Sequence, residues 1–169
     1  MSVRAAEAGD LPAVAAIYAP YVERTVITFE TEPPDAGAWA ARFDAVTARG
    51  LPFLVAESGG AVVGYAYAGP WKERAAYRHT VEDAIYLAPG ATGRGIGRAL
   101  LDTLLRACAN AGVQQVVAVI ADSGDPASTR LHTRCGFREV GRLERVGFKH
   151  GRWVDTVLMQ RGLVTASST

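Results

Sequence analysis

The 169-residue sequence predicts one α+β domain in which helices alternate with strands of a mixed, α/β-type sheet. Three consecutive segments carry this prediction: an alternating stretch at residues 80–87, an amphipathic stretch at 97–111 and a nearly continuous β-branched run at 115–121. Apolar residues recur at helical spacing in the second segment, and an unbroken apolar run is typical of a strand covered on both faces. The three segments therefore indicate a right-handed strand–helix–strand unit with two parallel strands.

The segments before this unit predict a short strand, two helices and a hairpin. Residues 3–5 are expected to form the strand. Asp10 and Asp35 are expected to cap helices that end near residues 18 and 48, because a carboxylate before a helix accepts hydrogen bonds from its first N–H groups. A β-hairpin is expected from two apolar runs that flank a Gly-Gly turn, at 52–57 and 61–68.

The segments after the unit complete the sheet. A further helix is expected at residues 127–134, and residues 138–160 predict two antiparallel strands around the turn His150-Gly151. Neither an internal repeat nor a linker divides the sequence. We therefore expect one domain over residues 1–161 and a short tail of small polar residues over 162–169.

Composition excludes several function classes. The chain has 18 Lys+Arg and 17 Asp+Glu, and this even balance argues against nucleic-acid or membrane-surface binding driven by bulk charge. Cys108 and Cys135 form no Cys-x-x-Cys pair, so no metal site is expected. Apolar runs such as 116–121 are far short of the ~20 residues of a membrane helix. With two thiols and no secretion signal, the sequence favours a cytoplasmic protein without membrane contact.

The strongest chemical signal is the loop Thr92-Gly93-Arg94-Gly95-Ile96-Gly97, between a predicted strand and the long helix. Alternating glycines let a ligand approach the backbone closely and leave the first helical N–H groups facing outward. Such a helix end attracts phosphate groups, and Arg94 and Arg98 add positive charge beside it. The loop therefore predicts a phosphate-binding site, with a flexible glycine turn as the alternative.

The spacing of the glycines narrows the choice of phosphate ligand. A Walker A loop is absent, and a dinucleotide fingerprint would need a third glycine where Arg98 stands. Asp122, which follows the next strand, keeps the dinucleotide alternative open. The remaining pattern, aligned on Gly95 and Gly97, resembles the pyrophosphate loop of the GCN5-related N-acetyltransferases (GNAT), which bind acetyl-CoA.

Other segments, from about residue 25 to residue 160, resemble one subgroup of that superfamily, the phosphinothricin and methionine sulfoximine acetyltransferases. The resemblance implies the GNAT fold, a mostly antiparallel sheet with a parallel βαβ core that binds acetyl-CoA and is flanked by helices. It also implies a homodimer. The segments occur in the family's order: Thr28-Phe29-Glu30-Thr31-Glu32-Pro33, Trp71-Lys72-Glu73-Arg74-Ala75-Ala76-Tyr77, Thr80-Val81-Glu82, Ile85-Tyr86-Leu87, Ser128-Thr129-Arg130-Leu131-His132 and Gly147-Phe148-Lys149-His150-Gly151-Arg152-Trp153.

The resemblance implies a set of residues that bind acetyl-CoA. Thr92 stands where the family usually has Arg or Gln, and its hydroxyl and Arg94 are expected to compensate. Asp125 stands where the family usually has Asn. The set is Ile85, Tyr86, Leu87, Thr92, Gly93, Arg94, Gly95, Ile96, Gly97, Arg98, Asp125 and Ser128.

The resemblance also assigns catalytic roles. Glu82 matches the carboxylate that accepts a proton from the substrate amine through ordered water, and a solvent-facing strand carboxylate is the alternative. The backbone N–H of about Leu87 matches the donor to the oxyanion. His132 matches the segment that supplies a proton to the departing thiolate, and a histidine bonded to its own helix is the alternative.

A further set is expected to bind the substrate. Lys72, Arg74 and Lys149 match positions that contact anionic groups. The alternative for each residue taken alone is a charged side chain that faces solvent and binds nothing. Together with the aromatic residues they suit a small anionic amino acid whose α-amine is acetylated. The alternatives are acetylation of peptide N-termini or other small amines, and a non-catalytic CoA-binding sensor. The remaining members of the substrate set are Phe29, Tyr77, Glu82 and Tyr86.

Overall fold

The protein, described here by a computed structural model over residues 1–163, is built on one seven-stranded sheet with the order β1-β2-β3-β4-β5-β7-β6. The β4–β5 pair is parallel, and the other five neighbouring pairs are antiparallel. The predicted mixed, mostly antiparallel sheet is therefore confirmed. Its strands are β1 (Ser2–Ala5), β2 (Phe53–Ser58), β3 (Ala61–Pro70), β4 (Thr80–Leu87), β5 (Gln115–Ala121), β6 (Arg138–Lys149) and β7 (Arg152–Gly162).

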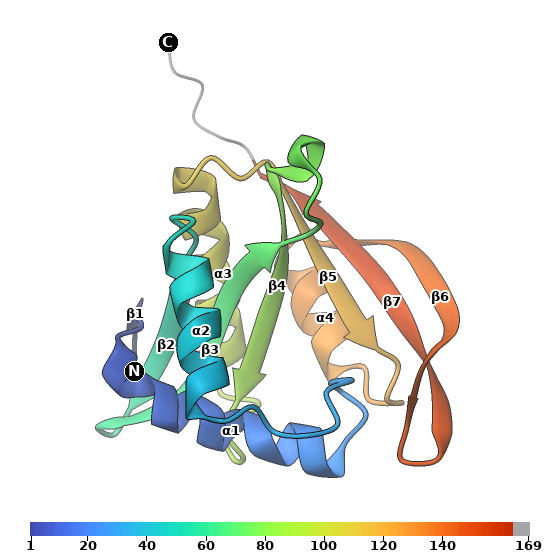
Figure 1. Cartoon of the computed structure of the whole chain (residues 1–169), viewed down its shortest axis with the longest axis horizontal. Coiled ribbons are helices and arrows are strands. Elements are labelled where there is room, and N and C mark those ends of the chain that lie inside the picture. The colour runs from blue at the N-terminus through green and yellow to red at the C-terminus, as the bar shows by residue number, and fades with distance from the viewer. Residues whose placement is uncertain (164–169) are drawn as a thin grey trace.

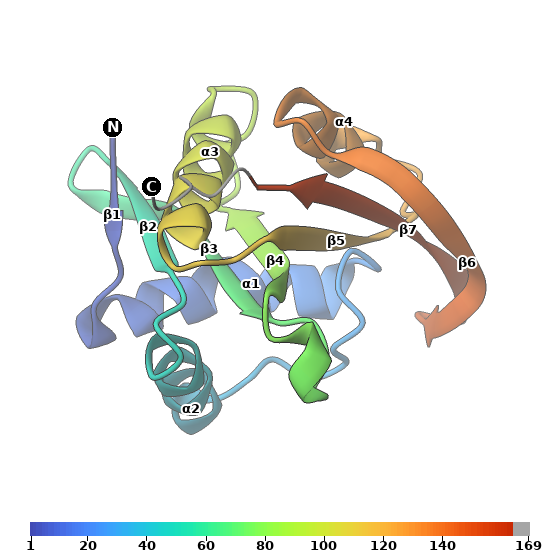
Figure 2. The ribbon, with the colours of Figure 1, turned by 90° about the horizontal axis from the view of Figure 1, so that it is seen from above.

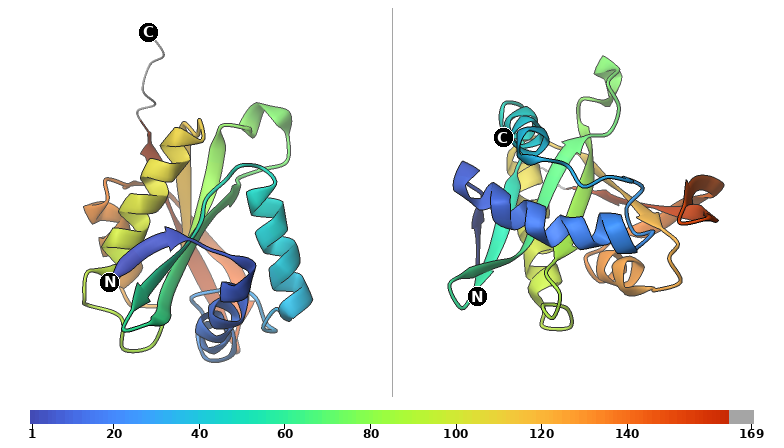
Figure 3. Two further views of the ribbon diagram at one scale, coloured as in Figure 1. Left: turned by 90° about the vertical axis from the view of Figure 1, so that its left-hand side faces the viewer. Right: turned by 60° about the horizontal axis from the view of Figure 1, so that its bottom comes forward.

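Helices cover the sheet on both faces (Figure 1). Figure 2 and the left view of Figure 3 show α1 and α2 on one face and α3 and α4 on the other. Short 3-10 turns precede α1 and β4. The helical elements are η1 (Ala8–Asp10), α1 (Leu11–Arg24), α2 (Ala36–Thr47), η2 (Ala75–Tyr77), α3 (Ile96–Asn110) and α4 (Ala127–Arg134).

Each face of the sheet has its own apolar core. The α3 face buries the residues that the sequence pattern placed on one side of the helix: Leu100, Leu101, Leu104, Leu105 and Cys108. The α1–α2 face buries a mostly aromatic group whose rings pack edge-on or stacked: Tyr18, Trp39, Phe53 and Tyr65. These two cores fix the helices against the central strands.

The parallel strands β4 and β5 separate after a short contact. Residues Thr80, Val81 and Glu82 pair with Gln115, Val116 and Val117, and β4 then continues to Leu87 without pairing with β5. Figure 1 shows the two strands diverging. The expected cover on both faces of β5 is therefore incomplete: Val119, beyond the last pair, is 37% exposed.

Helix α1 corrects one predicted boundary. It continues to Arg24, not residue 18, although Pro20 lies inside it. Proline removes one helical hydrogen bond, and burial of Val22 on the core side compensates for that loss. Asp35 does cap α2, where its Oδ1 accepts from the Ala38 N–H at 2.8 Å. Asp10 instead binds the Arg4 guanidinium at 2.8 Å and does not cap α1 through its side chain.

The end of the described chain corrects a second boundary. Gly162, which the sequence placed in the tail, belongs to β7 and pairs with Gln115. The Leu163 N–H donates to the Gln114 carbonyl at 2.8 Å, and its side chain packs against the core. The rest of the predicted tail, 164–169, lies outside the described residues. Across residues 1–163, no helix has the length and apolarity needed to cross a bilayer.

Candidate active site

A cleft of about 1010 Å³ opens where β4 and β5 separate. Residues from both faces of the sheet line it, so the opening connects the α1–α2 side to the α3–α4 side. The predicted residues among its lining are Glu82, Ile85, Tyr86, Leu87, Thr92, Gly93, Gly95, Gly97, Arg98, Asp125, Ser128 and His132. The cleft thus brings together both predicted catalytic side chains and ten of the twelve residues predicted to bind acetyl-CoA.

The glycine loop forms the N-terminal end of α3. Gly95 is the residue before the helix and has φ +79°, a left-handed conformation that side chains rarely adopt. Gly97 lies in the first turn, where a Cβ would meet the Leu131 side chain of α4 at 3.3 Å. The glycines therefore serve two purposes, since Gly95 shapes the loop and Gly97 lets α3 approach α4. The first N–H groups of this 15-residue helix have no side-chain cap, and they lie at the end of α3 that borders the cleft. A helix end of this kind is suited to binding a pyrophosphate.

Two members of the predicted loop set lie outside the cleft lining. Ile96 is 2% exposed and its side chain packs in the core, so a contact with acetyl-CoA would have to use its backbone, and this assignment stays a prediction. The Arg94 side chain is exposed beside the loop, so its charge lies next to the cleft without forming part of its wall. Arg98 does line the cleft, and its Nε lies 3.5 Å from Asp102 Oδ2.

The open edge of β4 presents backbone groups to the cleft. The Ala88 N–H donates to the Val63 carbonyl of β3 at 2.9 Å. Because successive N–H groups of a strand point to opposite edges, the Leu87 N–H faces away from β3, toward the opening. The Tyr21 hydroxyl donates to the Leu87 carbonyl at 2.7 Å and holds this end of the strand. The Leu87 N–H is therefore free on the cleft side of β4, and its role as the oxyanion donor stays a prediction.

Glu82 lies at the closed end of the opening, as the last β4 residue that pairs with β5. Burial raises the pKa of Glu82, and the negative charge of neighbouring Asp83 raises it further, while the Lys72 ammonium lowers it. The net shift is upward, which makes the carboxylate a stronger base than a solvated glutamate. The half-buried, cleft-lining position excludes the alternative of a freely solvated strand carboxylate.

His132 lines the cleft but is 2% exposed, and both of its ring nitrogens have protein partners. Nδ1 lies 2.7 Å from the Ser128 carbonyl, four residues earlier on α4. Nε2 lies 2.9 Å from Asp83 Oδ2 on β4. The bond within its own helix is the alternative that the sequence left open, and the bond to Asp83 was not anticipated. A role as the acid for the thiolate stays a prediction.

The loop before α4 places Asp125 and Ser128 at the cleft. Asp125 Oδ1 accepts from the Ala127 N–H at 2.9 Å, so this side chain orders the start of the helix. An asparagine carbonyl would accept the same bond, and the departure from the family's residue therefore preserves the local backbone. What changes is the charge, because the carboxylate adds a negative group to a wall that faces the phosphate site.

The residues predicted to bind the substrate do not gather at one place in the structure. Lys72 stacks its ammonium 4.7 Å from the Trp71 ring centre, and Arg74 and Tyr77 are exposed around η2; none of the three lines the cleft. Phe29 is 38% exposed, and its ring lies against the backbone of Gly147, where a Cβ would collide with it.

Lys149 requires a correction. The sequence assigned it to the substrate's anionic group, but the residue is 5% exposed and is not part of the cleft wall. Its Nζ donates to the Thr28 carbonyl at 2.7 Å, and burial lowers the pKa of the ammonium although Glu30 opposes that shift. Lys149 therefore ties β6 to the segment after α1, and its hydrogen bond is structural.

Sequence reasoning missed a charged pair on the α1–α2 side of the cleft. Arg42 of α2 donates to Glu30 Oε1 at 2.7 Å, and both line the cleft together with Tyr67 of β3. Arg42 and Glu30 are separated by twelve residues, so only the packing of α2 over the sheet brings them together. The sequence did offer one signal for this pair, the Thr28-Phe29-Glu30 segment that carries part of the family resemblance. From the sequence alone, the Glu30 carboxylate in that segment had no assigned role.

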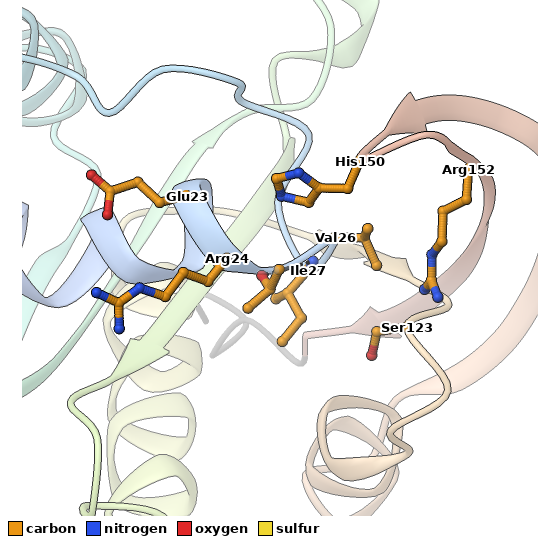
Figure 4. A pocket seen from close by; sticks show the side chains of 8 residues that line it. Glu23, Arg24, Val26, Ile27, Ser123, His150 and Arg152 are labelled. Atoms are coloured by element: carbon orange, nitrogen blue, oxygen red, sulfur yellow. Dashed lines mark hydrogen bonds between the residues drawn. The ribbon is translucent and has the colours of Figure 1, made fainter.

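A second hollow of about 520 Å³ lies between the end of α1, the loop after β5 and the β6–β7 turn (Figure 4). Ile27 and Ser123 line both this hollow and the cleft, so the two lie side by side. Figure 4 shows Arg24, His150 and Arg152 around it. No predicted site residue lines this hollow.

Comparison with known proteins identifies the fold and the loop. The sequence profile described as Acetyltransferase (GNAT) family matches residues 14–137, which include β4, the glycine loop and α4. The chain belongs to the GNAT family. Within it, the chain is 49% identical over 168 residues to a phosphinothricin N-acetyltransferase of Alcaligenes faecalis, covering 99% of this chain and 85% of the relative.

Two further GNAT relatives bear on the cleft. An L-methionine sulfoximine/L-methionine sulfone acetyltransferase of Pseudomonas aeruginosa is 39% identical over 163 residues, which cover 96% of this chain and 94% of the relative. A crystal structure of a phosphinothricin acetyltransferase from Sinorhizobium meliloti, in complex with acetyl-CoA, superimposes with a TM-score of 0.93. That chain is 45% identical, with 99% of this chain and 91% of the other covered.

The residues of this GNAT chain fit acetyl-CoA. A loop with two glycines at positive φ and an outward-facing helix end suits the pyrophosphate. The unpaired edge of β4 offers N–H and C=O groups to an extended amide-containing arm, as an added strand would use them. Within residues 1–163, no cluster of His, Cys, Asp and Glu side chains is suited to a metal ion.

Proposed function

We propose that the protein is an acetyl-CoA-dependent N-acetyltransferase that acetylates the α-amine of phosphinothricin, methionine sulfoximine or a similar small anionic amino acid. One observation carries the proposal: Glu82, with a raised pKa, lies at the closed end of the opening between β4 and β5, on the cleft that also contains the glycine loop. The named activities of the relatives supply the substrate class. In this arrangement, a bound acetyl thioester and the proposed base would lie in the same cleft.

In the proposed mechanism, the bound cosubstrate supplies an activated acetyl thioester. Glu82 accepts the proton that the substrate ammonium must lose, directly or through one water, and so releases the neutral amine. The amine nitrogen then bonds to the thioester carbon, and the Leu87 N–H donates to the oxygen that becomes negative. The C–S bond breaks, the sulfur leaves as thiolate, and the nitrogen, which carries a positive charge after the attack, releases its second proton to water to give the neutral amide. His132 is the proposed proton donor to that sulfur, and this role requires its Nε2 to leave Asp83.

The experiment that tests the function measures free-thiol release from acetyl-CoA with phosphinothricin, methionine sulfoximine, methionine and a short peptide. Turnover restricted to the first two, with low KM, is the expected result. Turnover on the peptide alone would show that the enzyme acetylates peptide N-termini and would contradict the proposed amino-acid substrate. Acetyl-CoA binding without turnover on any amine would instead favour the sensor.

Arg74→Ala is expected to raise the amino-acid KM about tenfold, because a charge-assisted bond to the substrate's anionic group would be lost. The acetyl-CoA affinity should stay constant, since Arg74 lies outside the loop at α3. Steady-state kinetics in both substrates measure the change. Arg78→Ala, an exposed arginine at the other end of η2, is the matched control. An unchanged KM for Arg74→Ala would remove this residue from the substrate site.

We also propose a homodimer. The β6–β7 hairpin supports it, because the hairpin exposes five large apolar side chains that would be costly to leave in water: Val140, Leu143, Val146, Phe148 and Trp153. Light scattering should give about twice the 17.9 kDa chain mass. A mass of one chain at micromolar concentration would contradict this assembly.

A further inference from the structure

Two consecutive residues of β4 point to opposite faces of the sheet at the point where the strand leaves β5. Glu82 is the last residue paired with β5, and Asp83 is the first residue beyond that pairing. Since strand side chains alternate, Glu82 faces the α1–α2 side and Asp83 faces α3 and α4. The Asp83 side chain is 1% exposed and meets His132 of α4. A buried carboxylate thus lies directly behind the proposed base.

The Asp83–His132 contact is an ion pair with fixed geometry. His132 Nδ1 faces a carbonyl oxygen, Ser128 O, and must therefore carry a proton, while Nε2 faces the Asp83 carboxylate. The ring also packs edge-on against Phe137, with centroids 4.9 Å apart. Burial alone lowers the pKa of His132, but Asp83 and Ser128 outweigh it, and the net pKa shift is upward. The upward shift favours the protonated ring, which donates through both nitrogens.

We propose that Asp83 is a positioning residue for Glu82, and that its ion pair with His132 fixes β4 at the point where the strand separates from β5. The pair joins the two walls of the cleft, because Asp83 begins the open edge of β4 and His132 belongs to the helix that carries Ser128. Such an anchor would hold the Glu82 carboxylate within about 1 Å of its working position. Larger displacements of a catalytic group cost orders of magnitude in rate. The inference rests on the proposed function.

The charge of Asp83 also reaches Glu82. Asp83 Oδ1 is buried and has no hydrogen-bond partner among residues 1–163, so only His132 offsets the carboxylate through a direct bond. The negative charge raises the pKa of Glu82, after the larger effect of burial. The other charged or titratable groups that interact with Glu82 are Lys72, from the loop after β3, and Tyr67 of β3. On the α3–α4 side of the sheet, the Asp83 charge also acts on Cys108 of α3. Burial has the larger effect on the pKa of the Cys108 thiol, and the negative charge of Asp83 raises that pKa further.

The decisive variant is Asp83→Asn, which keeps the shape and can still hydrogen-bond to His132. We expect kcat to fall about tenfold, because the base becomes weaker and less firmly placed. The acid limb of the kcat/KM profile should move to lower pH, since removal of a neighbouring negative charge lowers the pKa of Glu82. The acetyl-CoA Kd should change less than about twofold, because α3 and its loop are untouched. Thr156→Val is the matched control: Thr156 is also a buried polar strand residue, and it lies outside the cleft lining.

His132→Gln separates positioning from acid catalysis. If the pair acts as a unit, the double variant Asp83→Asn/His132→Gln should be no slower than the slower single variant, a departure from additivity. An unmoved acid limb in Asp83→Asn, or a kcat loss that only follows its melting temperature, would overturn the proposal. So would a large loss in His132→Gln beside full activity in Asp83→Asn, because His132 would then act independently of Asp83.

A second readout does not depend on turnover. The carboxylate carbon of Glu82 can be titrated by NMR in protein labelled at glutamate side chains, with Glu82→Gln to assign the signal. Asp83→Asn should lower the Glu82 pKa, whereas Thr156→Val should leave it unchanged. A wild-type protein that releases no thiol with any amine contradicts the proposed function, and the titration still decides the inference. An unchanged Glu82 pKa in Asp83→Asn contradicts the inference even in an active enzyme.

Discussion

Replacing Glu82 with glutamine is expected to lower kcat at least about a hundredfold, the usual contribution of a positioned general base. Glutamine has nearly the same shape as glutamate, so the strand and the cleft should be preserved while the proton acceptor is lost. Acetyl-CoA should bind with unchanged affinity, because Glu82 lies at the closed end of the opening and the glycine loop lies beyond Leu87. Thiol-release kinetics and a binding titration of the same variant measure the two effects.

The pH profile adds a second signature of this variant. Glu82 must be ionised to accept a proton, so wild-type activity should rise with pH through the raised pKa of this carboxyl. The variant should lack that limb. Glu139→Gln, an exposed carboxylate of β6, is the control and should behave as wild type. A Glu82→Gln enzyme with near-normal kcat and a normal acid limb would exclude Glu82 as the base.

The central unit could be predicted from the sequence because its signals are local. The bounds of β4, β5 and α4 follow directly from residue patterns, and the apolar spacing on α3 defines the face that is buried. Strand periodicity also sets Glu82 and Asp83 on opposite faces, and the glycines before α3 mark a helix end that faces a ligand. Each of these features depends on residues within one or two elements.

The substrate side could not be predicted in the same way, because packing between distant elements decides it. Arg42 reaches Glu30 only when α2 lies over the sheet, and no spacing in the sequence marks that contact. Lys149 has the charge expected of an anion-binding residue, yet the fold turns its Nζ to the Thr28 carbonyl. The bond between His132 and Asp83 likewise spans 49 positions in the chain. A residue's charge indicates which ligands it can bind, but the fold determines which partner it meets.

Gly95→Val is expected to weaken acetyl-CoA binding at least about tenfold, through the backbone and the space beside the phosphates. Gly95 has φ +79°, and a non-glycine residue in a left-handed conformation costs roughly 1–2 kcal/mol. Apart from the residues next to Gly95 in the chain, no atom of residues 1–163 lies within 4 Å of the added Cβ, so the side chain would extend into the space before α3 instead of colliding with the chain. Calorimetric titration with acetyl-CoA measures the affinity.

Gly112→Val separates loss of the binding site from simple strain. Gly112 follows the other end of α3 and has φ +83°, and among the described residues no atom beyond its chain neighbours lies within 4 Å of an added Cβ. It does not line the cleft. The two variants should therefore lose similar thermal stability, because the backbone penalty is the same in kind. If only Gly95→Val loses acetyl-CoA affinity, the loop binds the cosubstrate through its position at the helix end. Equal losses of affinity in both variants would instead attribute the effect to a destabilised α3, and the phosphate site would have to lie elsewhere on the cleft.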